Sequence, residues 1–585
     1  ELWRAGLVDR VRGERYRMHD AVRSYAAARL AADEDRAGAA AAHERLIRTY
    51  AQLADTVIGM VDGRTSTRAG TYPGSGAVAG HGFTSLDAAL RWLEDESSFI
   101  TAALRHAEGV DQRAVLNLLG ALCDFCLLRG DLYRLGEIDE LAQAVRTTGQ
   151  ARLVRSVQWR TGIAARQLGE LDKARTTLAS VVDQYFEDRH EAGAARALVS
   201  LGITLHHQGN LAEAAARISE AIALQAPPEL AGDRAWALHA LGAVERDRTR
   251  VAEARALLER SLALHRESGS VHGEAWAHFQ LGQVFLRTGD VPRAETELRR
   301  ALDLYGRTHD ARGEAWALTQ LGRARVVDGD PGPGVERLRE ALARHREAED
   351  ARGEAWTLYH LGHALEEQGE RDPAVRELER ARTMFSRMRD VYGLACARHH
   401  SGRVTRDQRA ALTGNLRNSG FARQLLVDAR ADFRRIGLAH GEAWTCLELA
   451  VVDGGNGRPA QAVALCEAAV GLFASYGDRR GEDWARFLRC TLLPYASPGA
   501  GPETARAELA ALAAATHPAR DARLTDCAEA YGVILARGVD PVQGDWPGWR
   551  LSLVPNRHSR EILGVPPAPG GVPPAAESGV PPTAE

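Results

Sequence analysis

Apolar residues in the middle of the chain recur at helical spacing, and the whole pattern returns at one constant interval (242 − 202 = 40). Leu-Gly pairs mark the period at Leu201-Gly202, Leu241-Gly242, Leu281-Gly282, Leu321-Gly322 and Leu361-Gly362. Within the unit from Gly273 to Leu304, apolar side chains fall three or four positions apart in two stretches, which Gly289 and Asp290 separate. Each unit is therefore predicted to be a pair of antiparallel helices. A pair this short has to stack on its neighbours to bury its apolar faces.

Residues suited to helix ends stand between the predicted helices. Gly289 suits the left-handed conformation that closes a helix, Asp290 suits the N-cap of the next helix, and Pro292 suits its first turn. Between units, polar residues stand three positions before the Gly of the next first helix. These predicted N-caps are Ser270, Asp310, Asp350 and Asp390.

The repeating frame resembles the tetratricopeptide repeat, which carries Gly in the first helix of each pair and a small residue in the second. Gly202, Gly242, Gly282, Gly322 and Gly362 match the first position, and Ala214, Ala254, Ala294, Gly334 and Ala374 match the second. The resemblance implies an all-α solenoid, a right-handed superhelix of antiparallel helix pairs. It extends from about position 115 to position 490. The repeat loses its phase after Gly402. A GEAW motif opens several of the first helices, and the Gly of its last copy, Gly441, follows the equivalent Gly393 at a longer interval (441 − 393 = 48).

The first residues have a different pattern. The stretch RYRMHDAVRSYAAARL, residues 15–30, resembles the end of the winged-helix module in STAND-class signalling ATPases of the NB-ARC type. That family has a Met-His-Asp motif, which Met18, His19 and Asp20 match. The resemblance implies that His19 contacts the phosphates of bound ADP or ATP. The alternative is a histidine on the surface or between domains.

The order of segments resembles AfsR-like bacterial transcriptional regulators. It implies a partial winged-helix end with a following helix at 1–55, a flexible linker at 56–82, a helical adaptor at 83–114, a repeat array at 115–400, degenerate repeats at 401–540 and a disordered Pro/Gly-rich tail at 541–585. The residues contain no GxxxxGK[ST] phosphate loop. ATP hydrolysis by the chain alone is therefore not expected. A nucleotide-binding ATPase and any DNA-binding domain are expected upstream of it.

Composition limits the other function classes. A net charge of −4 gives no overall attraction to nucleic acid, so DNA contact is expected only through upstream domains. No apolar run reaches the roughly 20 residues of a membrane span, and a cytoplasmic protein is expected. The seven scattered cysteines fit reduced thiols. Cys123 and Cys126 form a CxxC motif in an apolar stretch, where core packing is the main interpretation and a metal or redox role the alternative.

Positions that vary between repeats predict a recognition surface. Offsets of 0, 3, 7 and 11 from each repeated Trp lie on one face of the first helix, which lines the concave groove in tetratricopeptide-repeat proteins. The predicted partner-binding residues are Trp236, His239, Trp276, Phe279, Gln283, Trp316, Arg323, Trp356, Tyr359 and His363. Their chemistry suits a protein or peptide partner. For the tryptophans, packing between units is the alternative.

Catalytic and metal-binding sets do not stand out from the repeat background. No catalytic residue or metal ligand is predicted, and the adjacent His206 and His207 are expected to point in different directions. Two functions remain: the sensor and autoinhibitory arm of a STAND-type regulator, and a free-standing scaffold without a nucleotide-linked switch. An enzyme is the third, less favoured interpretation.

Overall fold

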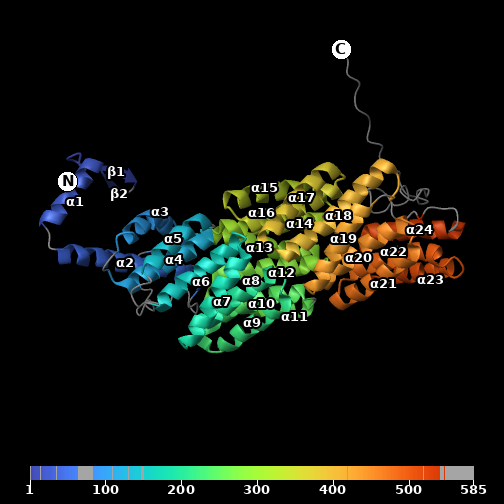
Figure 1. The fold of residues 1–585 in the computed structure, drawn as a ribbon, viewed down its shortest axis with the longest axis horizontal. Coiled ribbons are helices and arrows are strands. Elements are labelled where there is room, and N and C mark those ends of the chain that lie inside the picture. The colour runs from blue at the N-terminus through green and yellow to red at the C-terminus, as the bar shows by residue number, and fades with distance from the viewer. Residues whose placement is uncertain are drawn as a thin grey trace, which may run out of the picture.

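The computed structural model is built almost entirely of helices (Figure 1). It describes residues 2–12, 15–33, 36–63, 83–107, 110–129, 131–145, 151–248, 250–417, 419–517, 519–539 and 546. Strands β1 (Val8–Arg12) and β2 (Arg15–Met18) form an antiparallel hairpin, followed by α1 (Asp20–Asp33), α2 (Arg36–Asp62) and α3 (Leu86–Leu104). No helix in these ranges is both long enough and apolar enough to cross a membrane.

Helical pairs make up the rest of the molecule. They are α4 (Gln112–Arg129) with α5 (Leu132–Val145), α6 (Ala151–Gln167) with α7 (Leu171–Glu187), α8 (Glu191–His207) with α9 (Leu211–Leu224), α10 (Ala231–Asp247) with α11 (Val251–Ser268), α12 (Val271–Arg287) with α13 (Val291–Thr308), α14 (Ala311–Val327) with α15 (Pro331–Glu347), α16 (Ala351–Glu367) with α17 (Arg371–Met388), α18 (Val391–Thr413) with α19 (Gly420–Arg435), α20 (Ala439–Gly455) with α21 (Pro459–Tyr476), and α22 (Arg479–Ala496) with α23 (Gly501–Ala514). A short 3-10 turn (Pro228–Leu230) precedes α10, and α24 (Ala522–Arg537) follows the last pair. The predicted all-α solenoid is confirmed.

The predicted period is confirmed by the starts of the first helices. From α8 to α18 these helices begin at positions 191, 231, 271, 311, 351 and 391, and the next first helix, α20, begins after a longer step (439 − 391 = 48). The break in phase comes from α18, which has 23 residues where α16 has 17. The predicted boundary between positions 400 and 401 lies inside this helix. The regular and degenerate repeats are therefore continuous through α18.

The repeated glycine of each first helix allows close packing within a pair. A Cβ atom added at Gly282 would lie 2.7 Å from Cγ of Leu298 on α13, and the equivalent distance from Gly242 to Leu258 is also 2.7 Å. These distances are too short for van der Waals contact, so any larger residue would push the two helices apart. The small second-helix residue Ala294 is fully buried at the same interface.

The predicted helix ends are also confirmed. Ser270, Asp310, Asp350 and Asp390 each accept a hydrogen bond from the backbone N–H three residues on, at 3.1, 2.7, 3.0 and 2.8 Å. Gly289 has a φ of +78°, and Asp290 accepts from the N–H of Arg293 at 3.3 Å.

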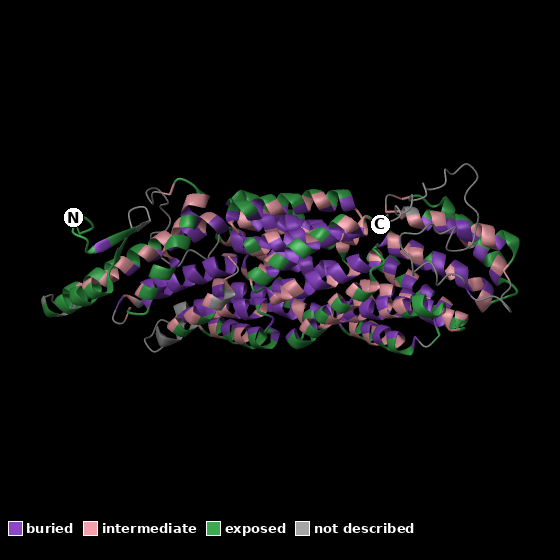
Figure 2. Ribbon diagram, turned by 90° about the horizontal axis from the view of Figure 1, so that it is seen from above, coloured by how far each residue is buried: buried purple, intermediate pink, exposed green. Residues whose placement is uncertain are grey.

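The superhelix winds tightly enough for successive turns to touch. Helices α2, α3 and α4 contact α12, α13 and α14. His309 lies 2.8 Å from Asp87, which belongs to the start of α3, and Arg480 donates to the carbonyl oxygen of Val327 at 3.2 Å. The contacts between turns therefore deepen the predicted concave groove into a cavity. Buried residues run along the inside of the elongated body, and exposed residues lie on its outer helices (Figure 2).

Two predicted boundaries are wrong in part. Residues 56–62 of the predicted linker are the last turns of α2, and Val57, Ile58 and Val61 are buried there because the helical apolar period continues. In the predicted tail, Trp546 is 5% exposed and donates from Nε1 to the hydroxyl of Thr491 at 3.2 Å. The remainder of both segments, 64–82 and 547–585, lies outside the described residues.

Candidate ligand-binding cavity

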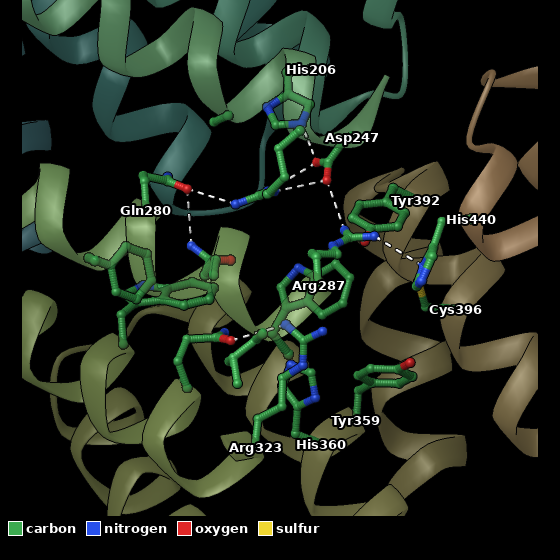
Figure 3. Close-up of a pocket in the computed structure, with 18 of the residues that line it drawn as sticks. His206, Asp247, Gln280, Arg287, Arg323, Tyr359, His360, Tyr392, Cys396 and His440 are labelled. Carbon is green, nitrogen blue, oxygen red and sulfur yellow. Dashed lines mark hydrogen bonds and ion pairs between the residues drawn. The ribbon is translucent and has the colours of Figure 1, made fainter. Parts of the chain in front are cut away.

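A cavity of about 1400 Å³ lies inside the superhelix. Its walls come mainly from the even-numbered helices α2 to α24, and the odd-numbered helices form an outer layer. Figure 3 is a close-up of the part where α10, α12, α14, α16 and α18 meet. Pockets for small molecules commonly measure about 300–1,000 Å³. The cavity is therefore large enough for a ligand of polypeptide size.

All ten side chains that the sequence predicts as partner-binding line this cavity. They are Trp236, His239, Trp276, Phe279, Gln283, Trp316, Arg323, Trp356, Tyr359 and His363. They occupy one face of each first helix, and the superhelix turns that face inward. Thr319, at a stripe position of α14, instead lies inside the wall with its hydroxyl 2.8 Å from that of Thr357. Binding of a polypeptide by these residues remains a prediction.

The tryptophans have both of the roles that the sequence left open. Trp316 and Trp356 are each 8% exposed, so most of their surface packs between units. Trp316 donates from Nε1 to Asp350, the N-cap of α16, at 2.9 Å. Trp276 packs edge-on against His239 of the preceding repeat, with ring centroids 6.4 Å apart. The indoles therefore join neighbouring repeats, and their remaining exposed surface faces the cavity.

A carboxylate and two guanidinium groups form a network in the wall (Figure 3). Asp247 accepts from Nε of Arg246 at 3.0 Å and from Nη2 of Arg287 at 2.8 Å, and it lies 2.8 Å from Nε2 of His206. Burial opposes ionisation of Asp247, but the two arginines outweigh burial and hold its pKa well below the usual value. Arg287 also donates to the hydroxyl of Tyr392 at 2.7 Å, which joins α12 to α18.

Arg323 has no comparable carboxylate. Its Nη1 donates to Oε1 of Gln320 at 3.2 Å, and no acidic group of the described chain lies within ion-pair distance. Burial and the nearby Arg287 lower the pKa of its guanidinium. Figure 3 shows Arg323 in the same part of the cavity as Arg287 and His360. A partly buried cation without an anion is destabilising in the free protein and attracts an anionic group of a ligand.

Arg403 on α18 is paired with two carboxylates of α16. Nε of Arg403 lies 2.7 Å from Glu366, and its Nη2 donates to Glu367 at 2.9 Å. Burial raises the pKa of Glu366 to about 8, although Arg403 opposes the shift. The guanidinium of Arg403 is therefore neutralised within the wall, in contrast to that of Arg323.

Comparison with protein families supports the predicted repeat. Residues 233–307 and 156–185 match tetratricopeptide-repeat families. The chain contains tetratricopeptide repeats. A search of curated proteins finds no match to the sequence.

Solved structures resemble the tetratricopeptide-repeat region in fold. A Rap protein complexed with competence and sporulation factor matches at 13% identity, over 62% of this chain and 100% of that chain, with a TM-score of 0.47. Aspartyl phosphate phosphatase F from Bacillus subtilis matches at 9% identity over 60% of this chain and 91% of that one, with a TM-score of 0.37. A STAND protein with a tetratricopeptide repeat sensor, from Pyrococcus horikoshii, matches at 12% identity over 64% of this chain and 55% of that one, with a TM-score of 0.36. Similarities at this level carry no argument about function. The repeats themselves suggest protein–protein interaction or sensing.

The predicted nucleotide contact lies apart from the tetratricopeptide repeats. His19 stands between β2 and α1, on the N-terminal piece at the left of Figure 1. Its side chain is 50% exposed, and Nε2 lies 3.4 Å from the carboxylate of Asp9 on β1. In this segment a hairpin is followed by a helix, and no helix precedes the hairpin in the described residues. A role of His19 in nucleotide binding remains a prediction.

The paired cysteines belong to the core. Cys123 and Cys126 on α4 are buried, and burial raises the pKa of Cys126 to about 12. This shift disfavours the thiolate that metal binding or redox chemistry needs. Core packing is therefore the better supported of the two interpretations.

Sequence analysis missed several residues of the cavity wall on α8, α18 and α20. Tyr392, His400 and Arg403 on α18 and His440 on α20 line the cavity, as does His207, which shares it with His206. A signal for the residues of α20 was available, because the GEAW motif at Gly441 places Trp444 at the position of the earlier tryptophans.

Proposed function

We propose that this chain is the sensor region of a STAND-type bacterial transcriptional regulator, and that its cavity binds a polypeptide segment. The observation that carries the proposal is the lining of the cavity. Its aromatic, amide, guanidinium and imidazole groups lie at repeat positions that vary, whereas the positions that hold the helices together are constant. Large aromatic side chains and arginines contribute most to recognition of polypeptides.

The charge pattern supports a ligand with an acidic group. Arg323 has no carboxylate partner in the described chain, and an aspartate, glutamate or terminal carboxylate of the ligand supplies one. Phe279 and Tyr359 line the same space and offer apolar contact beside that charge. A peptide with an acidic residue next to an apolar one therefore fits best.

The N-terminal piece supports contact with a further domain. Trp3, Tyr16, Tyr25 and Leu30 are 50, 52, 68 and 50% exposed. Large exposed apolar side chains on so short a segment are typical of a surface that contacts another domain or protein. We propose that an upstream ATPase covers it, and that His19 there contacts ADP or ATP.

The proposed mechanism is a shift between two states. The repeats hold the ATPase closed, and a polypeptide that binds the open state more tightly releases it. In this proposal the chain has no catalytic role of its own, and DNA contact belongs to upstream domains. Its place of action is the cytoplasm.

Ligand binding is tested by selecting peptides from a random displayed library on the full chain and measuring their affinity by calorimetry. Phe279→Ala and Tyr359→Ala are expected to weaken binding, because both lose contacts in the cavity. Phe421, which is 68% exposed on α19, provides the matched control: Phe421→Ala keeps the parent affinity. Selected peptides whose affinity is the same in all three variants would place binding outside the cavity.

The switch is tested by nucleotide exchange in the whole regulator, with and without residues 115–540. Faster exchange after removal of the repeats is expected, and His19→Ala is expected to release ADP faster than the control His106→Ala, another exposed histidine. Unchanged exchange would favour the scaffold interpretation, in which the repeats join proteins without a nucleotide-linked step.

A further inference from the structure

Three side chains with metal-binding groups converge where α16 and α18 meet. His363 and Glu366 lie on α16 and His400 on α18, and each offers one ligand atom within 4.8 Å of the other two. The spacing of three positions places His363 and Glu366 on one helix face. Nδ1 of His400 is 3.7 Å from Oε2 of Glu366, and the rings of His363 and His400 have centroids 4.5 Å apart.

Polar atoms of this cluster are buried without hydrogen bonds. Glu366 and His400 are 4% and 7% exposed, and among the residues that the structure describes neither oxygen of Glu366 nor Nδ1 of His400 has a hydrogen-bond partner. Nε of Arg403 forms an ion pair with Glu366 at 2.7 Å, but it too makes no hydrogen bond. Buried polar groups nearly always have a partner, so unsatisfied atoms that face one another indicate a missing bound species.

The charge around the cluster indicates that this species is a cation. Arg403 pairs with Glu366 and Glu367. The next arginine, Arg406, pairs with Asp407 and Glu448, each at 2.6 Å, so carboxylates outnumber guanidinium groups beside the cluster. A more distant cation, Arg523 of α24, acts on Glu367 but also on Asp521. An excess of carboxylates matches a bound cation rather than an anion.

The geometry points to a divalent transition-metal site formed by His363, Glu366 and His400, with Zn²⁺ as the cation that fits best. Two imidazoles and one carboxylate are a common zinc ligand set, which leaves a fourth position for water or a ligand. Donor atoms about 2.0–2.2 Å from a tetrahedral zinc ion lie roughly 3.3–3.6 Å apart, close to the 3.7 Å between His400 and Glu366.

The fourth coordination position opens into the cavity. His363 and His400 both line the cavity, whereas Glu366 lies behind them in the wall. Glu367, whose Oε1 lies 3.5 Å from Nε2 of His363, is placed to orient that imidazole, as carboxylates commonly do for ligand histidines. The site does not depend on the proposed function, because a chain that binds no peptide still presents these ligands.

The sequence did not predict these metal ligands because they come from two different repeats. His400 belongs to the repeat that follows the one containing His363 and Glu366. No local motif therefore reveals the set, and only the stacking of α16 on α18 brings it together.

The experiment uses the full chain after removal of metal by a chelator. Calorimetric titration with Zn²⁺ is expected to give one site per chain, and Co²⁺ is expected to give the visible absorption of tetrahedral coordination. His400→Ala and Glu366→Gln are expected to weaken Zn²⁺ binding at least about tenfold. Glu366→Gln keeps the size of the side chain, so a loss of binding with unchanged helical circular dichroism is not a folding effect.

The matched control is His207→Ala, which removes another buried imidazole of the cavity wall that lies outside the cluster. It is expected to bind Zn²⁺ as the parent chain does. The assignment is overturned if the parent chain takes up no Zn²⁺, if His400→Ala and Glu366→Gln bind as the parent does, or if His207→Ala loses binding equally.

Discussion

Arg287 and Asp247 occupy the same position of neighbouring repeats and meet at 2.8 Å in the wall of the cavity. One full period separates them (287 − 247 = 40), and each stands eleven positions after its repeated tryptophan. The residue at this position varies from repeat to repeat, and in the folded chain the Asp and Arg of two neighbouring repeats form an ion pair there. Variation at this position therefore stabilises the stacking of repeats, in addition to any role in ligand binding.

Asp247→Asn is expected to destabilise the chain by about 3–5 kcal/mol, because it leaves Arg246 and Arg287 buried without their carboxylate. Chemical denaturation followed by circular dichroism measures the loss. The control is Asp172→Asn, since Asp172 pairs with Arg389 on the surface, where the side chains are 49% and 75% exposed. An exposed pair contributes less than about 1 kcal/mol. Equal losses in the two variants would contradict the importance of the buried network.

Gly282→Ala is expected to cost about 1–3 kcal/mol, because the new methyl group would lie 2.7 Å from Leu298. Gly306→Ala on α13 is the matched control. A Cβ atom there meets only Oε1 of Glu314, at 3.6 Å, so the better helix propensity of alanine is expected to stabilise by about 0.5–1 kcal/mol. Thermal unfolding of both variants tests the opposite signs. Two changes of the same sign would show that close packing at Gly282 is not what limits residue size.

The pH dependence of stability is expected to depend in part on Asp55. Burial raises its pKa to about 7 in the folded chain, against 3.8 for an ordinary aspartate, although Arg160 opposes the shift. The folded state therefore binds more protons than the unfolded state between about pH 4 and pH 7, and this contribution to stability is lost as the pH rises through that range. Asp55→Asn is expected to remove the loss, which amounts to at most about 4 kcal/mol at pH 8.

Denaturation at pH 4 and at pH 8 measures the effect of Asp55. The variant is expected to match the parent at the lower pH and to exceed it at the higher pH. Asp303→Asn, at an exposed position of α13, provides the comparison and is expected to leave the pH profile unchanged. A parent profile that is flat between these pH values would argue against a protonated Asp55.

Arg323→Met is expected to raise thermal stability, because it replaces a partly buried cation that has no carboxylate in the described chain with an apolar side chain of similar length. The same change is expected to weaken binding of acidic peptides selected on the parent chain. Arg246→Met, which removes a partner of Asp247, is expected to lower stability instead. A loss of stability in Arg323→Met would mean that this guanidinium supports the fold rather than a ligand.

Much of the architecture was predictable because its cause is local. Each predicted N-cap accepts a hydrogen bond from a backbone N–H only three residues further on; these caps are Ser270, Asp310, Asp350 and Asp390. The glycines of the first helices meet the same close-packing requirement in each unit. Segment boundaries were less predictable. Composition favoured a linker from position 56, but the apolar period of α2 continues to Asp62, and Trp546 is buried within a stretch whose composition favours disorder.

The sequence predicted many of the residues that line the candidate cavity, but it did not predict that they surround a cavity. A stripe on one helix face follows from helical periodicity, and all ten predicted side chains line the cavity. The partners of those side chains were not visible, because they come from other repeats. Arg287 meets Tyr392, which lies three repeats further along the chain, only because the superhelix brings α12 and α18 together.

The sequence by itself determined the helix pairs, the constant step between them, their caps and the face that turns inward, since each depends on contacts within one repeat or with the next. Tertiary structure alone decided that successive turns touch, that the groove is a cavity, and which charges remain without partners inside it. Those outcomes depend on small rotations between repeats that add up over a whole turn of the superhelix, from Asp87 to His309 or from Asp172 to Arg389, and no local pattern records such a sum.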